Sequence, residues 1–175
     1  MELRGFVVGV FFSFFLFLLF NSYFGGNCAI SADAVFSPQS EGEIIELIRS
    51  ANTNIDLEMY VFTNEKIARE LGDASARGVS VRVIMEQRVD SYNQEEIVDA
   101  LISSGVEVRW ASFEYKLTHT KMMLVDGERV FVGSTNFSKS AMGENREMAV
   151  VLEGDIVSQF IFEFEKDWRM GGLVE

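Results

Sequence analysis

The sequence predicts an α/β fold, a mixed β-sheet flanked by helices, preceded by an N-terminal hydrophobic helix. Segments with helix-like and strand-like spacing of apolar residues alternate from residue 41 to the end of the chain. The first 35 residues differ sharply, because Phe, Leu and Val dominate them. The remaining stretch of about 140 residues supports one substantial core and no more. We therefore expect an N-terminal targeting segment over residues 1–35 and a single domain over residues 36–175.

The N-terminal segment has the composition of a membrane-targeting sequence. Residues 6–24 read FVVGVFFSFFLFLLFNSYF, and a helix of this length rises about 28 Å, close to the hydrocarbon thickness of a bilayer. Arg4 precedes the segment and acidic residues follow it, which places the domain on the side of the membrane opposite Arg4. The Ala-Asp-Ala triplet at residues 32–34 resembles a signal-peptide cleavage site. A retained membrane anchor and a cleaved signal both fit, so the protein is expected to be membrane-anchored or secreted, and extracytoplasmic in a prokaryote.

Six segments in the first half of the domain show a clear period. Apolar residues have helical spacing in residues 41–51, 65–77 and 94–103. They alternate, as in strands, or form a short apolar run in residues 55–62, 79–85 and 106–110. Gly78 and Gly105 follow the second and third helices and are typical residues for ending them.

The second half begins with a predicted hairpin. The apolar run 122–125 reads as a buried strand, Asp126-Gly127 is a tight-turn signal, and residues 129–132 return as a second strand. Residues 148–152 form another apolar strand. Asp155 is expected to cap a last helix, whose apolar stripe recurs every four positions at Ile156, Phe160, Phe164 and Trp168. We expect this stripe to lie in the core.

The residues that bear chemistry lie in and around this hairpin. His119 is the only histidine in the 175-residue chain, and Lys121, Ser134 and Asn136 follow it closely. An imidazole can attack phosphorus and form a covalent intermediate, which splits one hard displacement into two easier ones. Lys121 shares a strand face with His119, and the amide and hydroxyl can donate to phosphate oxygens, where transition-state charge concentrates. The set favours phosphate-ester chemistry and requires neither a metal nor a cofactor.

The spacing H-x-K-x4-D-x6-G-S-x-N, from His119 to Asn136, resembles the signature motif of the phospholipase D superfamily without insertion or mismatch. The resemblance covers essentially everything after the leader and implies a layered mixed-sheet domain with phosphodiesterase activity. It makes His119 the nucleophile, and Lys121, Ser134 and Asn136, together with His119, the phosphate-binding groups. Asp126 would support the site through hydrogen bonds and charge, although Asp-Gly is also an ordinary turn pair.

Two further groups are needed: a residue that orients His119 and a proton donor for the leaving oxygen. Glu147 resembles the acidic residue that orients the catalytic histidine in small single-motif members, where a carboxylate would set the imidazole tautomer. Double displacement also needs a group that protonates the leaving oxygen, and the chain has no second histidine. A single motif copy resembles the small endonuclease branch, which builds one site across a homodimer axis. We expect a homodimer here; a carboxylate of the same chain is the alternative.

Composition limits the partners. Cys28 is the only cysteine, which excludes an intrachain disulfide and a cysteine-based zinc site, and the preceding Gly-Gly-Asn departs from the usual lipoprotein motif. A net charge of −12 and a pI near 4.5 disfavour a broad basic surface for nucleic acid. Residues 109–146 are nevertheless locally positive, so either a narrow cationic groove or ordinary solvated charge fits. Phe113 and Tyr115, just before the motif, fit base stacking and core packing equally.

Three functions follow from these observations. The first is a membrane-targeted, homodimeric, metal-independent phosphodiesterase of the endonuclease type, which cleaves DNA or RNA through a phosphohistidine intermediate. The second is a phospholipase D-type hydrolase of phospholipid headgroups, which the membrane segment and the acidic surface favour. The third is a non-catalytic scaffold that uses the phosphate pocket for binding, which the intact set of His119, Lys121 and Asn136 disfavours.

Overall fold

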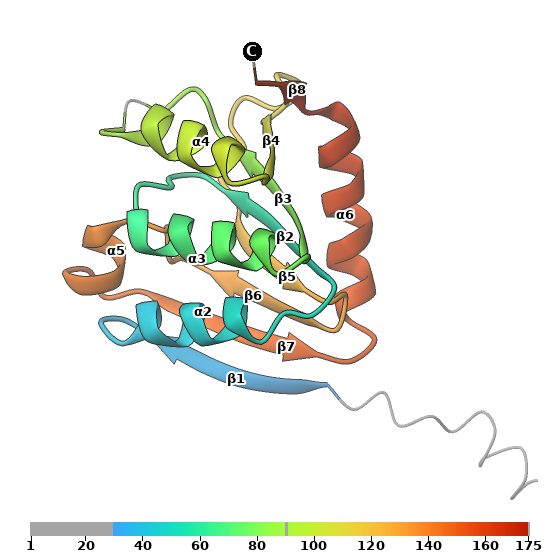
Figure 1. The fold of residues 1–175 in the computed structure, drawn as a ribbon. Helices are drawn as coiled ribbons and strands as arrows, with labels where there is room; N and C mark the ends of the chain where they lie inside the picture. The colour runs from blue at the N-terminus through green and yellow to red at the C-terminus, as the bar shows by residue number, and fades with distance from the viewer. Residues whose placement is uncertain (1–29, 90, 175) are drawn as a thin grey trace, which may run out of the picture.

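A computed structural model describes residues 30–89 and 91–174 of the chain. This described part forms one eight-stranded mixed sheet with helices on both faces (Figure 1). The strand order is β1-β7-β6-β5-β2-β3-β4-β8; β2, β3 and β4 are parallel, and every other neighbouring pair is antiparallel. The prediction of an α/β fold with a mixed, helix-flanked sheet is therefore confirmed.

The strands are β1 (Ser31–Phe36), β2 (Asn54–Met59), β3 (Ser80–Met85), β4 (Glu107–Trp110), β5 (Lys121–Val125), β6 (Arg129–Gly133), β7 (Met148–Glu153) and β8 (Gly172–Leu173). The helices are α2 (Ser40–Arg49), α3 (Glu65–Ala76), α4 (Gln94–Ser103), α5 (Lys139–Gly143) and α6 (Val157–Met170). Helices α2, α3 and α4 cover one face of the sheet, and α6 crosses the other (Figure 1).

The N-terminal hydrophobic helix expected over residues 6–24 lies outside the described residues, as does Cys28. Among residues 30–89 and 91–174, no helix is both long and apolar enough to cross a membrane.

Three short elements were not expected from the sequence: β1, α5 and β8. Strand β1 pairs antiparallel with β7, from Ser31 opposite Glu153 to Phe36 opposite Met148. Only Val35 of its six residues is buried, so no alternation of apolar and polar residues marks this edge strand. It crosses the boundary expected between residues 35 and 36, and residues 31–35 therefore belong to the sheet.

The start of the last helix differs from the expectation for Asp155. Helix α6 begins at Val157 with Ile156 as its N-cap, and no side chain forms a cap hydrogen bond there. Asp155 lies in the preceding turn, where its carbonyl, not its carboxylate, accepts from Ser158 Oγ. The expected side-chain cap is therefore wrong. The carboxylate is one residue too early in the turn to cap the first helical amides.

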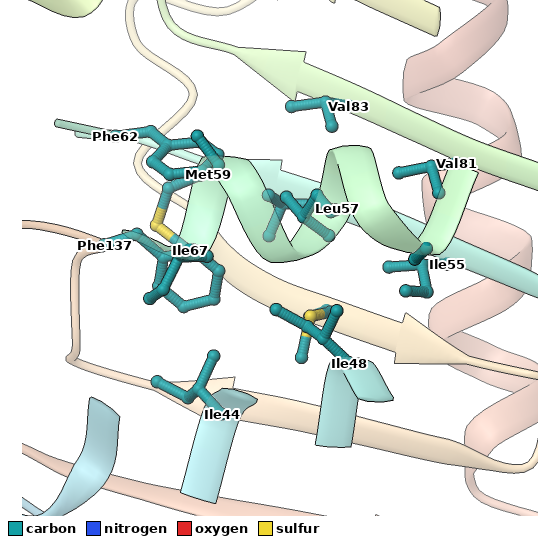
Figure 2. Packing of buried hydrophobic residues seen from close by; sticks show 14 of the residues in the cluster. Ile44, Ile48, Ile55, Leu57, Met59, Phe62, Ile67, Val81, Val83 and Phe137 are labelled. Carbon is teal, nitrogen blue, oxygen red and sulfur yellow. The ribbon is translucent and has the colours of Figure 1, made fainter. Parts of the chain in front are cut away.

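Two hydrophobic clusters, one on each face, hold the sheet between its helices. The larger cluster lies under α2, α3 and α4, and the view in Figure 2 labels Ile44, Ile48, Ile55, Leu57, Met59, Phe62, Ile67, Val81, Val83 and Phe137. The smaller lies under α6, where the Phe164 and Trp168 rings stack with centroids 5.9 Å apart. Ile156 and Phe160 pack against its edge, so the expected stripe does face the core.

Strand β2 has two buried carboxylates on the side that faces α6, and they differ in their hydrogen-bond partners. Asp56 accepts from Arg82 Nε at 2.7 Å, and Arg82 also donates to Glu165 of α6. Glu58 is 2% exposed, and its Oε1 has no hydrogen-bond partner among residues 30–89 and 91–174. Burial raises the pKa of Glu58 to about 8, and the nearby charges of Asp167 and Glu163 add to this effect. Glu58 is therefore mainly protonated at neutral pH.

Replacing Glu58 by Gln should stabilise the protein above pH 7 and flatten its pH dependence. The folded state keeps a proton up to pH about 8, whereas the unfolded chain releases it near 4.5. The free energy of unfolding therefore falls as pH rises from about 4.5 to 8, by on the order of a few kcal/mol, and levels off above that range. Urea unfolding between pH 5 and 9 measures this slope. The exposed control Glu128→Gln should keep it, and an unchanged slope in Glu58→Gln would contradict the assignment.

Candidate active site

Four of the predicted site residues meet at one end of the central strands of the sheet. Lys121 begins β5 and His119 lies two residues before it, while Ser134 and Asn136 follow the end of β6. Because β5 and β6 are antiparallel, with Met122 opposite Val132, the start of β5 lies beside the end of β6. Glu147 joins them because β7 begins at the next residue and runs antiparallel to β6.

At Gly133 the backbones of β6 and β7 lie unusually close to each other. A Cβ atom at Gly133 would lie 2.4 Å from Met148 O and 2.5 Å from Ala149 Cα. No side chain fits there, so the motif glycine is required by this close approach of two backbones. Immediately after it, Ser134 N donates to Met148 O at 2.9 Å. The glycine therefore fixes where Ser134 leaves the sheet.

Glu147 is bound to Ser134. The hydroxyl of Ser134 donates to Glu147 Oε2, and Asn145 Nδ2 donates to Glu147 Oε1 at 3.1 Å. Met148 N in turn donates to Ser134 Oγ at 3.2 Å. A hydrogen bond from the His119 ring to the Glu147 carboxylate is not among those of the described residues, so the role of Glu147 in orienting the imidazole stays a prediction. What the geometry shows is a carboxylate that holds the motif serine.

Lys121 is a partly desolvated cation beside the exposed imidazole. Its side chain is 7% exposed, and Nζ donates to His119 O at 2.9 Å. Burial lowers the pKa of Lys121, and the charge of Glu147 acts in the opposite direction. A cation in this position attracts phosphate more strongly than an exposed lysine, because less water screens it.

Tyr60 is a site residue that sequence reasoning missed. Its ring meets the His119 ring edge to face, with centroids 4.2 Å apart, and Lys121 Nζ lies 4.9 Å from its centroid. Tyr60 N donates to Thr120 O at 2.9 Å, which extends the pairing of β2 with β5. The only signal in the sequence is an aromatic residue at the end of a predicted strand, and nothing there indicates that β2 is the neighbour of the motif strand.

Asn136 is fixed from the other side of the site. Its Oδ1 accepts from Val61 N at 3.3 Å. Because the carbonyl half of the amide is used in this way, the NH2 group remains for another acceptor. The next residue, Phe137, forms a parallel bridge with Phe62 and packs against its ring. The loop after β6 is thus anchored to the loop after β2.

Asp126 lies away from this cluster, at the far end of β5. Lys121 is the first residue of the five-residue strand β5 and Asp126 follows its last, so the two lie roughly 17 Å apart along the strand. Its carboxylate accepts backbone N–H bonds from residues 52, 53 and 54 at 2.8–3.2 Å. Burial raises the pKa of Asp126, but these bonds and the Thr53 hydroxyl outweigh it and lower the pKa to about 2. Asp126 and Gly127 have φ of 56° and 66°, as a tight hairpin turn requires.

The structure therefore brings His119, Lys121, Ser134, Asn136 and Glu147 together and does not bring Asp126 to them. Asp126 fixes the hairpin turn and the start of β2 instead. Within the described residues, no group of three His, Cys, Asp or Glu side chains could hold a metal ion.

Known proteins share this motif-bearing domain. Residues 44–168 match the family model described as "Cardiolipin synthase, PLD-like domain". The chain belongs to the phospholipase D-like family. The resemblance seen in the motif is thereby confirmed, and it places the chain in a family of phosphodiesterases.

Among relatives of this phospholipase D-like protein are two named mitochondrial cardiolipin hydrolase. The one from Danio rerio is 30% identical over 131 residues, which cover 74% of this chain and 57% of the relative. The one from Homo sapiens is 30% identical over 136 residues, which cover 75% and 53%. The chain thus spans little more than half the length of these curated relatives.

Two solved structures match over nearly their full length. Nuc from Salmonella typhimurium, described as a phospholipase D family member, has a TM-score of 0.77 and 28% identity, and the match covers 82% of this chain and 97% of Nuc. NucT from Helicobacter pylori has a TM-score of 0.76 over 83% of this chain and 100% of NucT. At 21% identity, NucT supports the fold alone.

Replacing Gly133 by Ala should damage the site far more than the same change at Gly143. The added methyl group overlaps the β7 backbone at Gly133 and meets nothing within 4 Å at Gly143. We expect Gly133→Ala to force β6 and β7 apart, to lower stability by about 1–3 kcal/mol, and to displace Ser134. Thermal unfolding and activity of both variants measure this. Equal effects at the two positions would show that the close approach is not needed.

Proposed function

We propose that this phospholipase D-like chain is a metal-independent phosphodiesterase that cleaves DNA or RNA through a phosphohistidine intermediate. The observation that carries the proposal is the exposed His119 ring beside the desolvated Lys121, with Asn136 fixed so that its NH2 group is free. A nucleophile, a cation and an amide donor thus converge at one end of the central strands. This is the set that phosphoryl transfer needs.

The reaction has two displacements. In the first, a nitrogen of His119 attacks phosphorus, the bond to the leaving oxygen breaks, and that oxygen takes a proton. In the second, water attacks the phosphohistidine, gives up a proton, and releases the imidazole. Lys121 and Asn136 donate to the non-bridging oxygens in both steps. Ser134 becomes a further donor when its hydroxyl proton, which it donates to Glu147 in this structure, turns to the phosphate. The charge of Glu147 raises the pKa of Lys121 and so favours its cationic form, against the effect of burial.

The proton donor of the first step and the base of the second would come from a second copy of the chain. His119 is the only histidine available, and the group must titrate near neutral pH. A homodimer with a two-fold axis through the site places the two histidines on opposite sides of one phosphate. The exposure of His119, at one end of the central strands, supports this arrangement.

The N-terminal segment is proposed to target the enzyme to a membrane, and the catalytic domain follows it in the sequence. Because residues 31–36 form a strand of the sheet, cleavage after the triplet 32–34 would remove four of the six residues that pair with β7. Retention of the hydrophobic segment, or cleavage before residue 30, is therefore favoured over cleavage at the triplet. The protein is proposed to be held at a membrane, or secreted in the second case.

A phospholipase D-type hydrolase is the second candidate. The relatives named cardiolipin hydrolase favour it, and so do the exposed apolar side chains near the site, among them Phe113 at 71% and Met148 at 56% exposed. Both candidates use the same chemistry, and they differ in the substrate that reaches His119. A non-catalytic scaffold would bind phosphate and turn over neither substrate.

We expect the full chain, purified in detergent, to cleave labelled single-stranded DNA or RNA in EDTA, because neither displacement needs a metal. His119→Ala should lower the rate by at least about 10³-fold. The same preparation is assayed on vesicles of phosphatidylcholine with cardiolipin. Lipid turnover alone would establish the second candidate. Binding without turnover would establish the scaffold, and activity that returns only with a divalent metal would refute the phosphohistidine route.

A mixing experiment tests the shared site. Inactive His119→Ala chains are unfolded together with wild-type chains and refolded at a series of ratios. If each site needs the histidines of two chains, the activity per total protein falls as the square of the wild-type fraction. If one chain is sufficient, it falls in direct proportion. A linear dependence would therefore favour the alternative of a carboxylate from the same chain.

A further inference from the structure

A buried ion pair lies next to the segment that leads into His119. Glu86 follows β3 directly and is fully buried. Its carboxylate accepts from Arg88 Nε at 2.7 Å, from Arg88 Nη2 at 2.6 Å and from the Arg88 backbone N–H at 2.8 Å. Burial raises the pKa of Glu86, but the bonds from Arg88 and Thr118 outweigh it and leave the pKa lowered. The pair is therefore charged at neutral pH.

Both members of the pair bind the loop between β4 and β5. Glu86 Oε2 accepts from Thr118 N at 2.8 Å. Arg88 Nη1 donates to Tyr115 O at 2.7 Å, and Nη2 donates to Ser112 O at 3.1 Å. The guanidinium also lies 4.9 Å from the centroid of the exposed Phe113 ring. The loop, residues 112–118, has no regular secondary structure, so these contacts fix its course.

The contact at Thr118 is the one that bears on chemistry. Thr118 precedes His119 directly, and its N–H points to a carboxylate that is itself rigid. On the other side, the carbonyl of His119 accepts from Lys121 Nζ. The backbone that carries the nucleophile is thus held before the residue by Glu86 and after it by Lys121. Its ring packs on Tyr60.

We propose that Glu86 and Arg88 are positioning residues for His119. Arg88 fastens the loop at two carbonyls and orients the Glu86 carboxylate, which then holds the Thr118 peptide in the conformation that presents the imidazole to the phosphate. Neither side chain touches the reacting atoms. Where activity is the readout, the inference rests on the phosphodiesterase function proposed above, whereas its structural part does not.

The chain offers a matched control for a purely stabilising ion pair. Arg49 of α2 forms the same forked contact with Glu70 of α3, with Nε–Oε2 at 2.9 Å and Nη2–Oε1 at 2.6 Å. This pair joins two helices and belongs to neither the site nor the loop. An effect that follows from the loss of any forked Arg–Glu pair would appear at both places. An effect on His119 positioning should appear only at Arg88.

The single histidine gives a readout that does not depend on activity. Full-length protein without a histidine tag should show a single imidazole Cε1–H signal in a proton–carbon NMR spectrum, because His119 is the only histidine. We expect Arg88→Ala and Glu86→Gln to shift or broaden this signal. Arg49→Ala should leave it unchanged. Arg88→Lys keeps the charge but not the fork, so we expect an intermediate effect.

Kinetics supply the second readout. Loss of a residue that orients a catalytic group is expected to lower kcat by about 10- to 100-fold, with KM changed by less than about threefold, since no substrate contact is lost. A folded Arg88→Ala protein with the wild-type His119 signal and kcat would overturn the proposal. If Arg88→Ala does not fold, the same comparison is decided by Arg88→Lys. If the wild type turns over no substrate, the NMR comparison alone decides, and the failure then belongs to the proposed function.

Discussion

The site depends on the register of four adjacent strands, β2, β5, β6 and β7. Antiparallel pairing fixes which strand ends are neighbours, and it places the start of β5, the end of β6 and the start of β7 at one edge, with the end of β2 beside them. A slip by one residue would turn Lys121 to the other face of the sheet. Gly133 allows β6 and β7 to meet closely enough for Ser134 to bond across them. The motif thus spans the antiparallel hairpin of β5 and β6, and the lengths of these two strands and their turn set the spacing of its residues in the sequence.

Asp126 shows how a motif residue can be required without lying at the site. It is at the turn of the same hairpin, and its carboxylate binds three successive backbone amides at the start of β2. These bonds fix β2 relative to β5 at one end, and the pairing then sets the relation of Tyr60 to His119 at the other. The carboxylate therefore acts on the site through the strands. The predicted hairpin already puts Asp126 at the turn. The sequence could not reveal its contact with residues 52–54, because no local pattern shows that β2 lies beside β5.

Most of the fold could be predicted from the sequence, because its longer elements carry clear periodicity. The helices near 41–51, 65–77 and 94–103 and the motif hairpin are all present. Strand β1 carried no signal, since both of its faces are largely exposed. For the site, convergence of His119, Lys121, Ser134 and Asn136 follows from the hairpin alone. Tyr60, Glu86 and Arg88 could not be found in this way, because they reach the motif only through the strand order β5-β2-β3, which no local pattern encodes.

The charge distribution also looks different in three dimensions. The sequence makes residues 109–146 locally positive, yet three of their cations have separate partners. Arg129 lies at the turn end of the hairpin, where it donates to Ser50, and Arg109 donates to Trp168 O and stacks on that ring. Lys121 is enclosed in the site. With a net charge of −12, the chain would contact the nucleic acid proposed as its substrate through a small number of local contacts. Affinity would then come mainly from the phosphate at His119, which fits cleavage with little sequence preference, since contacts to phosphate carry no base information.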